Sequence, residues 1–580
     1  MRFSQPLRHP TAAASAPPQQ ATSVKETIVS IIIAFALAFV FRGFVIEAFL
    51  IPTGSMAPTL RGAHMTFKST ESGYEWAVTP KQYLDRTGQN PNPIQNGIVV
   101  HDPMSVGELD PSQPMSQPPG VSVPRNWGDR IFVMKYLYSI YDPERFDVVV
   151  FKNPRDPSIN FIKRLIGLPS QMVALIDGDV FYRDIQPGDL DAAGKPVAPD
   201  PWALPGWKAA RKPEAAQRAM WQPVFSSDYT PLKPVVDRRR WFYPPWRPAN
   251  ATASGWQIDD RRDYVYTGSA PTVLDWDAAK HPIVDSYPYN EGVNVGNLSV
   301  GPYPVSDLRL SLGIRPAAAG ETASAIVISR GHEFRGDIEG TKVTLRMRPV
   351  DASDQPTGDW TVVGSGELSS PLTPGEVTNI DFWHVDQSLK MFVNDRLVAQ
   401  GTYDWSPADR LRYSTGMSLE EILGKPTSLV EQFGSSWPVP GQASRPVYSR
   451  PNARFEFSGG AFTLYRVALA RDIYYQPNVY NFTESGQTHS KAGQPALGTH
   501  PTNTVILNKD EFFVCGDNSP QSLDARLWDV PSPWVAQIDP KMGVVNRDLL
   551  IGKAFFVYFP APLHRGNAPM PDFGAMRFIW

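Results

Sequence analysis

Cysteine is almost missing from this chain: Cys515 is the only one among 580 residues. An intrachain disulfide is therefore impossible, and so is a zinc site built from several thiolates. We expect a chain held together by packing alone, with no metal and no other cofactor.

The chain also has no excess of positive charge and few histidines. The net charge is −3, so no basic surface for nucleic acid is indicated, and we expect no nucleic-acid partner. None of the nine histidines stands in a recognisable triad setting, and the G-x-S-x-G elbow is absent. A serine hydrolase of the elbow type is therefore not indicated.

Proline, by contrast, is abundant, with 58 residues beside 16 tryptophans and 21 tyrosines. Together with the small number of long helical patterns, this composition favours β-rich domains with proline-bearing loops. A chain of 580 residues also exceeds one ordinary core, so we expect at least two domains and a mainly β fold.

Only one long apolar run is present, from Thr27 to Phe41. If Arg42 extends its charge toward the membrane surface, a helix over 27–46 reaches the ~20 residues that a bilayer requires. Residues 1–26 are rich in Ala, Pro, Gln and Ser and are typical of a disordered tail, which we place in the cytoplasm. A cleaved signal peptide is the alternative to an uncleaved anchor.

Directly after this run stands "FLIPTGSMAPTL", residues 49–60, with Ser55 between Gly and Met. A serine hydroxyl needs a base within hydrogen-bond reach to act as a nucleophile. A lysine buried in an apolar strand is such a base, because burial lowers its pKa by up to ~3–5 units. Lys163 in "INFIKRLIGLP" (159–169) fits, and we expect that strand to pair with 144–154. The alternative is an exposed strand lysine beside an exposed arginine.

A third stretch, "FFVCGDNSPQSLDARLW" (512–528), predicts a strand followed by a polar loop with Ser522, Asp524 and Arg526. Taken alone it is an ordinary hairpin loop. Taken with the other two, in this order, it resembles a family: the bacterial type I signal peptidases, membrane-anchored Ser/Lys proteases. "GDRIFVMKYLY" (128–138) and "DLLIGKAFFVYFP" (548–560) extend the resemblance.

The resemblance implies a role for each matching residue. Ser55 matches the nucleophile and Lys163 the general base, and no metal takes part. Thr53 and the backbone N–H of Ser55 match the oxyanion hole, and Ser522 matches the hydroxyl that holds the lysine amine. The supporting charged residues are Asp524, Arg526 and Arg164.

The family's substrate lies as an added β-strand beside the segments that precede the serine and the lysine. Carried over, this implies a shallow pocket for small side chains, walled by Ile51, Met56, Leu60, Phe161 and Ile162. Plain core packing is the alternative for each of these. The implied partners are the signal peptides of exported pre-proteins, the lipid bilayer and the export machinery. The implied location is the inner membrane, single-pass, with the catalytic domain on the extracytoplasmic side.

A long insert divides the matching segments. We expect a peptidase core with a signal-peptidase β-fold over 47–183 and 501–566, a proline-rich insertion at 67–126, an inserted region at 184–500 and a tail at 567–580. Short alternating strands over 251–476 resemble a jelly-roll-like (concanavalin or laminin-G-like) β-sandwich, with a hairpin turn at Asn394-Asp395. Because closing a longer loop adds little entropy cost, we expect this insert to be an appended domain that contributes nothing to the chemistry.

Two other functions fit parts of the sequence. One is a membrane-tethered protein whose sandwich binds a glycan or an envelope protein, with Trp383, Trp405 and His384 as candidate sugar-binding side chains; structural packing is the alternative for these three. The other is a self-cleaving Ser/Lys protease of the repressor type. The combination of Ser55, Lys163 and Ser522 argues against a mere scaffold, and the apolar helix argues against the repressor type.

Overall fold

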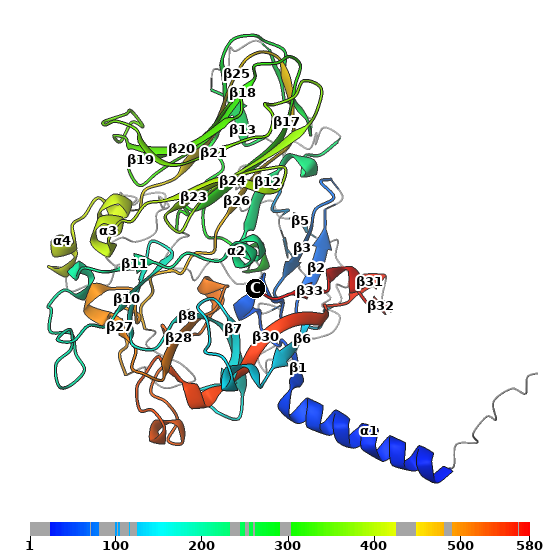
Figure 1. Cartoon of the computed structure of the whole chain (residues 1–580), viewed down its shortest axis with the longest axis vertical. Coiled ribbons are helices and arrows are strands. Elements are labelled where there is room, and N and C mark those ends of the chain that lie inside the picture. Colours follow the sequence, from blue (N-terminus) through cyan, green and yellow to red (C-terminus); the bar gives the residue numbers. More distant parts are fainter. Residues whose placement is uncertain are drawn as a thin grey trace, which may run out of the picture.

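The computed structural model describes residues 24–69, 71–80, 99–100, 102–104, 115–116, 125–232, 244–249, 255–258, 262–290, 303–424, 448–480, 490–565 and 568–580. Almost all of the predicted tail at 1–26 and most of the insertion at 67–126 lie outside these residues. Within them the protein is mainly β, as expected, and it has one long N-terminal helix (Figure 1).

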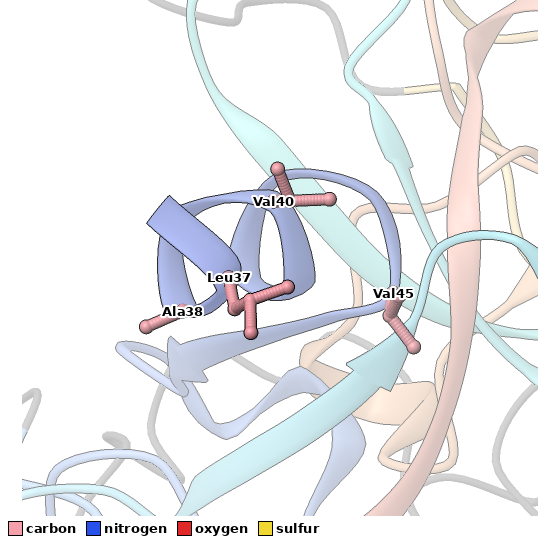
Figure 2. A pocket seen from close by; sticks show the side chains of 4 residues that line it. All are labelled: Leu37, Ala38, Val40 and Val45. Atoms are coloured by element: carbon pink, nitrogen blue, oxygen red, sulfur yellow. The ribbon is translucent and has the colours of Figure 1, made fainter. Parts of the chain in front are cut away.

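Helix α1 (Val24–Phe44) is long and apolar enough to cross a membrane, and it projects from the body of the protein (Figure 1). It ends before the expected limit at Ile46, because that residue already begins strand β1 (Ile46–Leu50). Figure 2 shows Leu37, Ala38 and Val40 on the last turns of α1, with Val45 next to the strand. The chain thus stays apolar from the helix into the first strand.

The part of the chain outside the insert is built on one eight-stranded sheet in the order β1-β6-β30-β7-β8-β28-β29, with β33 beside β30. The expected hairpin is confirmed, since β7 and β8 pair antiparallel with Val149 opposite Lys163. The remaining strands of this sheet are β6 (Arg130–Met134), β7 (Val148–Lys152), β8 (Asn160–Gly167), β28 (Glu511–Cys515), β29 (Val545–Asn546), β30 (Leu550–Phe559) and β33 (Arg577–Phe578).

The two ends of the insert leave and re-enter the core side by side. Strand β27 (Val505–Ile506) pairs with β9 (Gln171–Ile176), and Val505 lies opposite Val173. They belong to a four-stranded sheet, β11-β10-β9-β27, with β10 (Asp179–Asp184) and β11 (Lys208–Ala209).

Most of the insert is a sandwich of two antiparallel sheets that enclose a large apolar core. One sheet contains β12 (Gln222–Ser226), β14 (Trp256–Gln257), β15 (Tyr264–Tyr266), β17 (Leu308–Pro316), β22 (Thr378–Val385), β23 (Ser388–Val393), β24 (Arg396–Thr402) and β26 (Phe462–Arg471). The other contains β13 (Trp246–Pro248), β16 (Thr272–Trp276), β18 (Thr322–Ser329), β19 (His332–Glu339), β20 (Lys342–Pro349), β21 (Thr361–Glu367) and β25 (Asn452–Ser458).

The local turn signals of the sandwich are largely where the sequence puts them. Asn394 and Asp395 connect β23 and β24 with φ of 49° and 63°, the left-handed region that Asn and Asp tolerate. The sandwich starts earlier than residue 251, however. Strands β12 and β13 lie before that position, and the short helix α2 (Glu214–Met220) precedes β12.

The end of the chain is not a tail apart from the core. Strand β33 pairs with β30, Ile579 is buried in the core cluster that contains Met56 and Leu60, and Arg577 reaches Asp129 at 3.0 Å. This two-residue strand is too short to produce the alternating pattern from which strands are predicted.

Candidate active site

The loop after β1 places Ser55 on a short 3-10 turn, Gly54–Met56. Met56 and Leu60 are fully buried, and the Leu60 backbone N–H donates to the Met56 carbonyl at 2.8 Å. These two apolar side chains fix the loop on the core, while Ser55 between them and the entering strand stays half-buried. The loop is thus anchored on both sides of the hydroxyl.

Strand β8 brings Lys163 to this loop from 108 residues away. Its Nζ lies 2.6 Å from the Ser55 Oγ, and its side chain is only 4% exposed. Burial lowers the pKa of Lys163 to about 8, although Asp524, Cys515 and Asp517 act in the opposite direction. An appreciable fraction of neutral amine is therefore present near neutral pH, in hydrogen-bond contact with a serine hydroxyl.

The two carboxylates nearest this amine are both engaged by arginines. Asp517 accepts two hydrogen bonds from Arg164, each 2.7 Å long, and Asp524 accepts two from Arg526, each 2.8 Å long. All four side chains are fully buried. Burial by itself raises the pKa of Asp524, but Arg526 and the Gly516 N–H outweigh this and lower it. Because each charge is compensated locally, neither carboxylate forms an ion pair with Lys163.

The remaining site residues from the sequence lie around this pair at different depths. Ser522 is buried, and although its Oγ makes no hydrogen bond of good geometry within the described residues, it lies close enough to the Asp524 carboxylate to help lower the pKa of that group. Thr53 is exposed at the start of the Ser55 turn, and its side chain caps no backbone N–H there. The structure thus brings the Ser55–Lys163 pair close to two separate ion pairs, Arg164–Asp517 and Arg526–Asp524.

The five expected pocket residues divide between two apolar clusters. Ile51, Met56 and Leu60 are buried in one cluster, with Ile162 packed against it. Phe161 packs elsewhere, against the rings of Phe151 and Trp528 at 6.4 Å each. Because neighbouring residues of β8 point to opposite faces of the sheet, Phe161 and Ile162 do not line the same wall.

Two residues of the site were missed by sequence reasoning. The backbone N–H of Asn518 donates to the Ser55 carbonyl at 3.1 Å, and its Nδ2 donates to the Gly54 carbonyl at 2.9 Å. The same side chain pairs with Asn290, which belongs to the insert. The Gly-Asp-Asn turn is visible in the sequence, but nothing around Asn290 marks it as part of a site.

Four buried aspartates outside this site lie close enough to resemble a metal site: Asp179, Asp307, Asp386 and Asp472. Lys212, however, already lies between two of them, with its Nζ 2.5 Å from Asp386 and 2.6 Å from Asp472. The positive charge that these carboxylates need is supplied by a side chain, which argues for a structural ion network.

The candidate sugar-binding side chains are also structural. Trp383 and His384 are fully buried, and His384 bonds to the Ser306 carbonyl and the Tyr403 hydroxyl. Trp405 packs between the rings of Tyr403 and Tyr413, 4.7 Å from each. Stacking on a sugar requires an exposed ring face, so for Trp383 and His384 the alternative of structural packing is confirmed. Trp221 covers Trp383 at 5.4 Å.

Comparison with known proteins places this geometry in context. The family model described as "Signal peptidase, peptidase S26" matches residues 24–101, 120–206 and 465–559, on both sides of the sandwich. Signal peptidase I of Rickettsia typhi is 28% identical over 162 residues, which are 28% of this chain and 44% of the relative. Signal peptidase I of Rickettsia canadensis is 51% identical over 43 residues, which are 7% of this chain and 16% of the relative.

The first of these relatives is thus matched over less than half of its own length. Among solved structures, carbohydrate-binding module CBM66 from Bacillus subtilis covers 39% of this chain and 94% of its own, at 11% identity and a TM-score of 0.20. That score is too low to carry over a binding partner to the insert.

Proposed function

We propose that this chain is a membrane-anchored serine endopeptidase that removes N-terminal signal peptides from exported pre-proteins, because its segments on either side of the insert match the signal-peptidase family model and a signal peptidase I. Ser55 is the nucleophile and Lys163 the general base. The observation that carries the proposal is the 2.6 Å contact between the Ser55 Oγ and the buried Lys163 Nζ.

In the first half of the reaction, neutral Lys163 takes the proton of the Ser55 hydroxyl while its oxygen attacks the scissile carbonyl. The negative charge on the carbonyl oxygen is stabilised by the Ser55 backbone N–H and the Thr53 hydroxyl. The ammonium of Lys163 then gives its proton to the leaving amine, and an ester between Ser55 and the signal peptide remains.

In the second half, the same lysine takes a proton from water, and the resulting hydroxide equivalent attacks the ester carbonyl. Collapse of this intermediate returns the proton to the Ser55 oxygen and releases the signal peptide as a carboxylic acid. The buried Ser522 hydroxyl, which lies in the loop beside Asp524, takes the role of holding the lysine amine during both proton transfers. Local pairing of Asp517 and Asp524 with arginines keeps the base from being permanently protonated.

The anchor also fits this reaction. Strand β1 follows α1 after one residue, so the Ser55 loop lies close to the end of the apolar helix. We propose that α1 spans the inner membrane with the catalytic domain on the extracytoplasmic side, close to the export machinery. The nucleophile then lies at the depth where a signal peptide leaves the bilayer, which reduces the encounter to a question of orientation.

The proposal is tested with the full chain in detergent and a pre-protein that carries an Ala-x-Ala site. We expect cleavage after the second alanine, identified by the mass of the mature fragment, and its loss in Ser55→Ala. The exposed Ser158→Ala variant is the matched control. Intact pre-protein after prolonged incubation with the folded wild type would contradict the proposal.

A further inference from the structure

One turn of the insert lies against the nucleophile loop. This turn, η6 (Pro288–Asn290), ends a segment that comes from the sandwich. Asn290 and Asn518 form a closed amide pair: Asn290 Nδ2 donates to Asn518 Oδ1 at 2.7 Å, and Asn518 Nδ2 donates to Asn290 Oδ1 at 2.8 Å. Because Asn518 also holds the carbonyls of Gly54 and Ser55, only one side chain separates the insert from the nucleophile.

A second contact from the same turn acts on the loop by shape. The ring of Tyr289 lies so close to Gly54 that a Cβ added there would be 2.3 Å from the Tyr289 Cε1. The Tyr289 hydroxyl also donates to the Ala63 carbonyl at 3.2 Å, beyond the far end of the loop. The ring therefore determines how far the Ser55 turn can move outward.

The turn is itself held firmly by both parts of the protein. The Tyr287 hydroxyl donates to the Asp517 carbonyl at 3.1 Å, and the Arg471 guanidinium at the end of β26 covers the Tyr287 ring at 4.4 Å. Tyr287 is buried, and Asn518 is fully buried. The segment thus connects a long strand of the sandwich to the loop that carries the nucleophile.

We propose that Tyr289 and Asn290 are positioning residues for Ser55, so that the insert completes the active site. This inference rests on the proposed peptidase function and reverses the expectation that the insert contributes nothing to the chemistry. The core aims the Ser55 hydroxyl at Lys163 only while Asn518 is held by Asn290 and Gly54 is backed by Tyr289. The insert that separates the two halves of the core thereby contributes residues to the site.

The first test compares Asn290→Ala with Asn379→Ala in the full chain. Asn379 accepts a hydrogen bond from Arg466 within the sandwich, so the control loses a similar interaction far from Ser55. We expect kcat of Asn290→Ala to fall about 10- to 100-fold with KM unchanged, because a small misplacement of a reacting group has effects of this size. In an Asn518→Ala background we expect Asn290→Ala to cause no further loss. A kcat equal to that of the control, or an additive loss, overturns the proposal.

The second test is a rescue. Gly54→Ala brings a methyl group against the Tyr289 ring, and we expect it to lower kcat strongly. Combining it with Tyr289→Ala makes room for the methyl group, and we expect the double variant to be more active than Gly54→Ala alone. A double variant that is no better than Gly54→Ala shows that the ring does not set the position of the loop.

A third measurement does not depend on activity and separates this inference from the proposed function. Hydrogen–deuterium exchange of peptides that contain residues 52–60 and 516–520 should rise in Asn290→Ala and stay at the wild-type level in Asn379→Ala. If the wild type cleaves no pre-protein but exchange rises in Asn290→Ala, the proposed peptidase function is wrong and the positioning of the Ser55 loop by Tyr289 and Asn290 is supported. If exchange is unchanged in Asn290→Ala while the wild type cleaves normally, only the positioning role is overturned.

Discussion

Two buried lysines of this protein, Lys163 (4% exposed) and Lys212 (7% exposed), have opposite electrostatic surroundings. Lys163 contacts a neutral serine hydroxyl, and burial lowers its pKa to about 8. Burial also acts to lower the pKa of Lys212, but direct contacts with Asp386 and Asp472 outweigh it and raise that pKa above its ordinary value. Burial alone thus does not set the pKa of a lysine. The pKa falls where the nearest oxygen is a neutral hydroxyl and rises where it belongs to a carboxylate.

The two arginines near Lys163 have a clear electrostatic effect, because they neutralise the aspartates that would otherwise pair with the lysine. Asp517 and Asp524 lie near Lys163, as Asp386 and Asp472 lie near Lys212. Around Lys163 each carboxylate is paired with its own guanidinium, which under the proposed mechanism leaves the lysine free to act as a base. In the network between core and insert the lysine is the counter-ion, and its role is structural.

The largest expected effect follows from removing the lysine that we propose as the base. Lys163→Met keeps much of the side-chain volume but removes the proton acceptor, so we expect turnover of the pre-protein to fall by about 10³-fold or more. The unfolding midpoint of the variant should not fall, since a buried amine without an ion pair is replaced by an apolar group. Single-turnover kinetics with saturating enzyme measures the loss. A folded variant with near wild-type turnover would rule out the Ser/Lys mechanism.

Removing the paired lysine should have the reverse profile. Lys212→Met leaves Asp386 and Asp472 facing each other without a counter-ion, and we expect a loss of about 3–5 kcal/mol in the free energy of unfolding. Denaturant titration in detergent at pH 7 measures it, with the exposed Lys195→Met as control. Burial raises the pKa of Asp472 to about 6 even with Lys212 present, so the loss should shrink below that pH. A midpoint equal to that of the control would mean that this network stabilises nothing.

How far the sequence could predict this molecule depends on whether the signal is local. The turn at Asn394-Asp395 and the pairing of β7 with β8 follow from patterns within a few residues, and both are confirmed. The burial of Trp383 does not follow from local patterns, because Trp221, which covers it, comes from a distant segment before β12. Alternation along β22 shows that the strand has two faces, but it does not show which segment packs on each face.

The same limit applies within the active site. Ser55 and Lys163 are recognisable because each stands in a distinctive motif, although only the fold brings them to 2.6 Å. Asn290 pairs with a residue 228 positions away, and its own neighbours, Tyr-Pro-Tyr, carry no catalytic pattern. The family motifs do not extend into the insert, so its contact with the Ser55 loop is visible only in the fold.

A smaller effect is expected from the hydroxyl beside the base. Ser522→Ala removes a buried hydroxyl beside Asp524 that we propose to hold the amine of Lys163. We expect about a 10²-fold loss in kcat, as for a group that orients a base, with KM unchanged. Comparison with Ser519→Ala, which loses a hydrogen bond to Arg526 in the same loop, separates the two roles. Equal losses in both variants would mean that Ser522 only supports the loop.

The smallest effect is a shift along the pH axis, and it compares the two lysines most directly. In the proposed reaction the active form of Lys163 is neutral, so kcat/KM should rise with pH, with a midpoint near 8, and fall about tenfold per pH unit below it.

The same pKa shift affects stability. The folded pKa of Lys163 lies below the ordinary 10.5, so the unfolded chain binds this proton more tightly and stability rises from about pH 8 to 10.5. For Lys212 the sign is opposite: because its pKa is raised in the folded state, its contribution to stability is complete below 10.5 and falls as the pH rises from 10.5 through the folded pKa. The pH–rate profile with a peptide free of titratable groups, and the unfolding midpoint from pH 7 to 10 in wild type and Lys163→Met, measure both. The methionine variant should lose the rise in stability, and a rate that stays flat between pH 6 and 9 would show that no group like Lys163 titrates in the reaction.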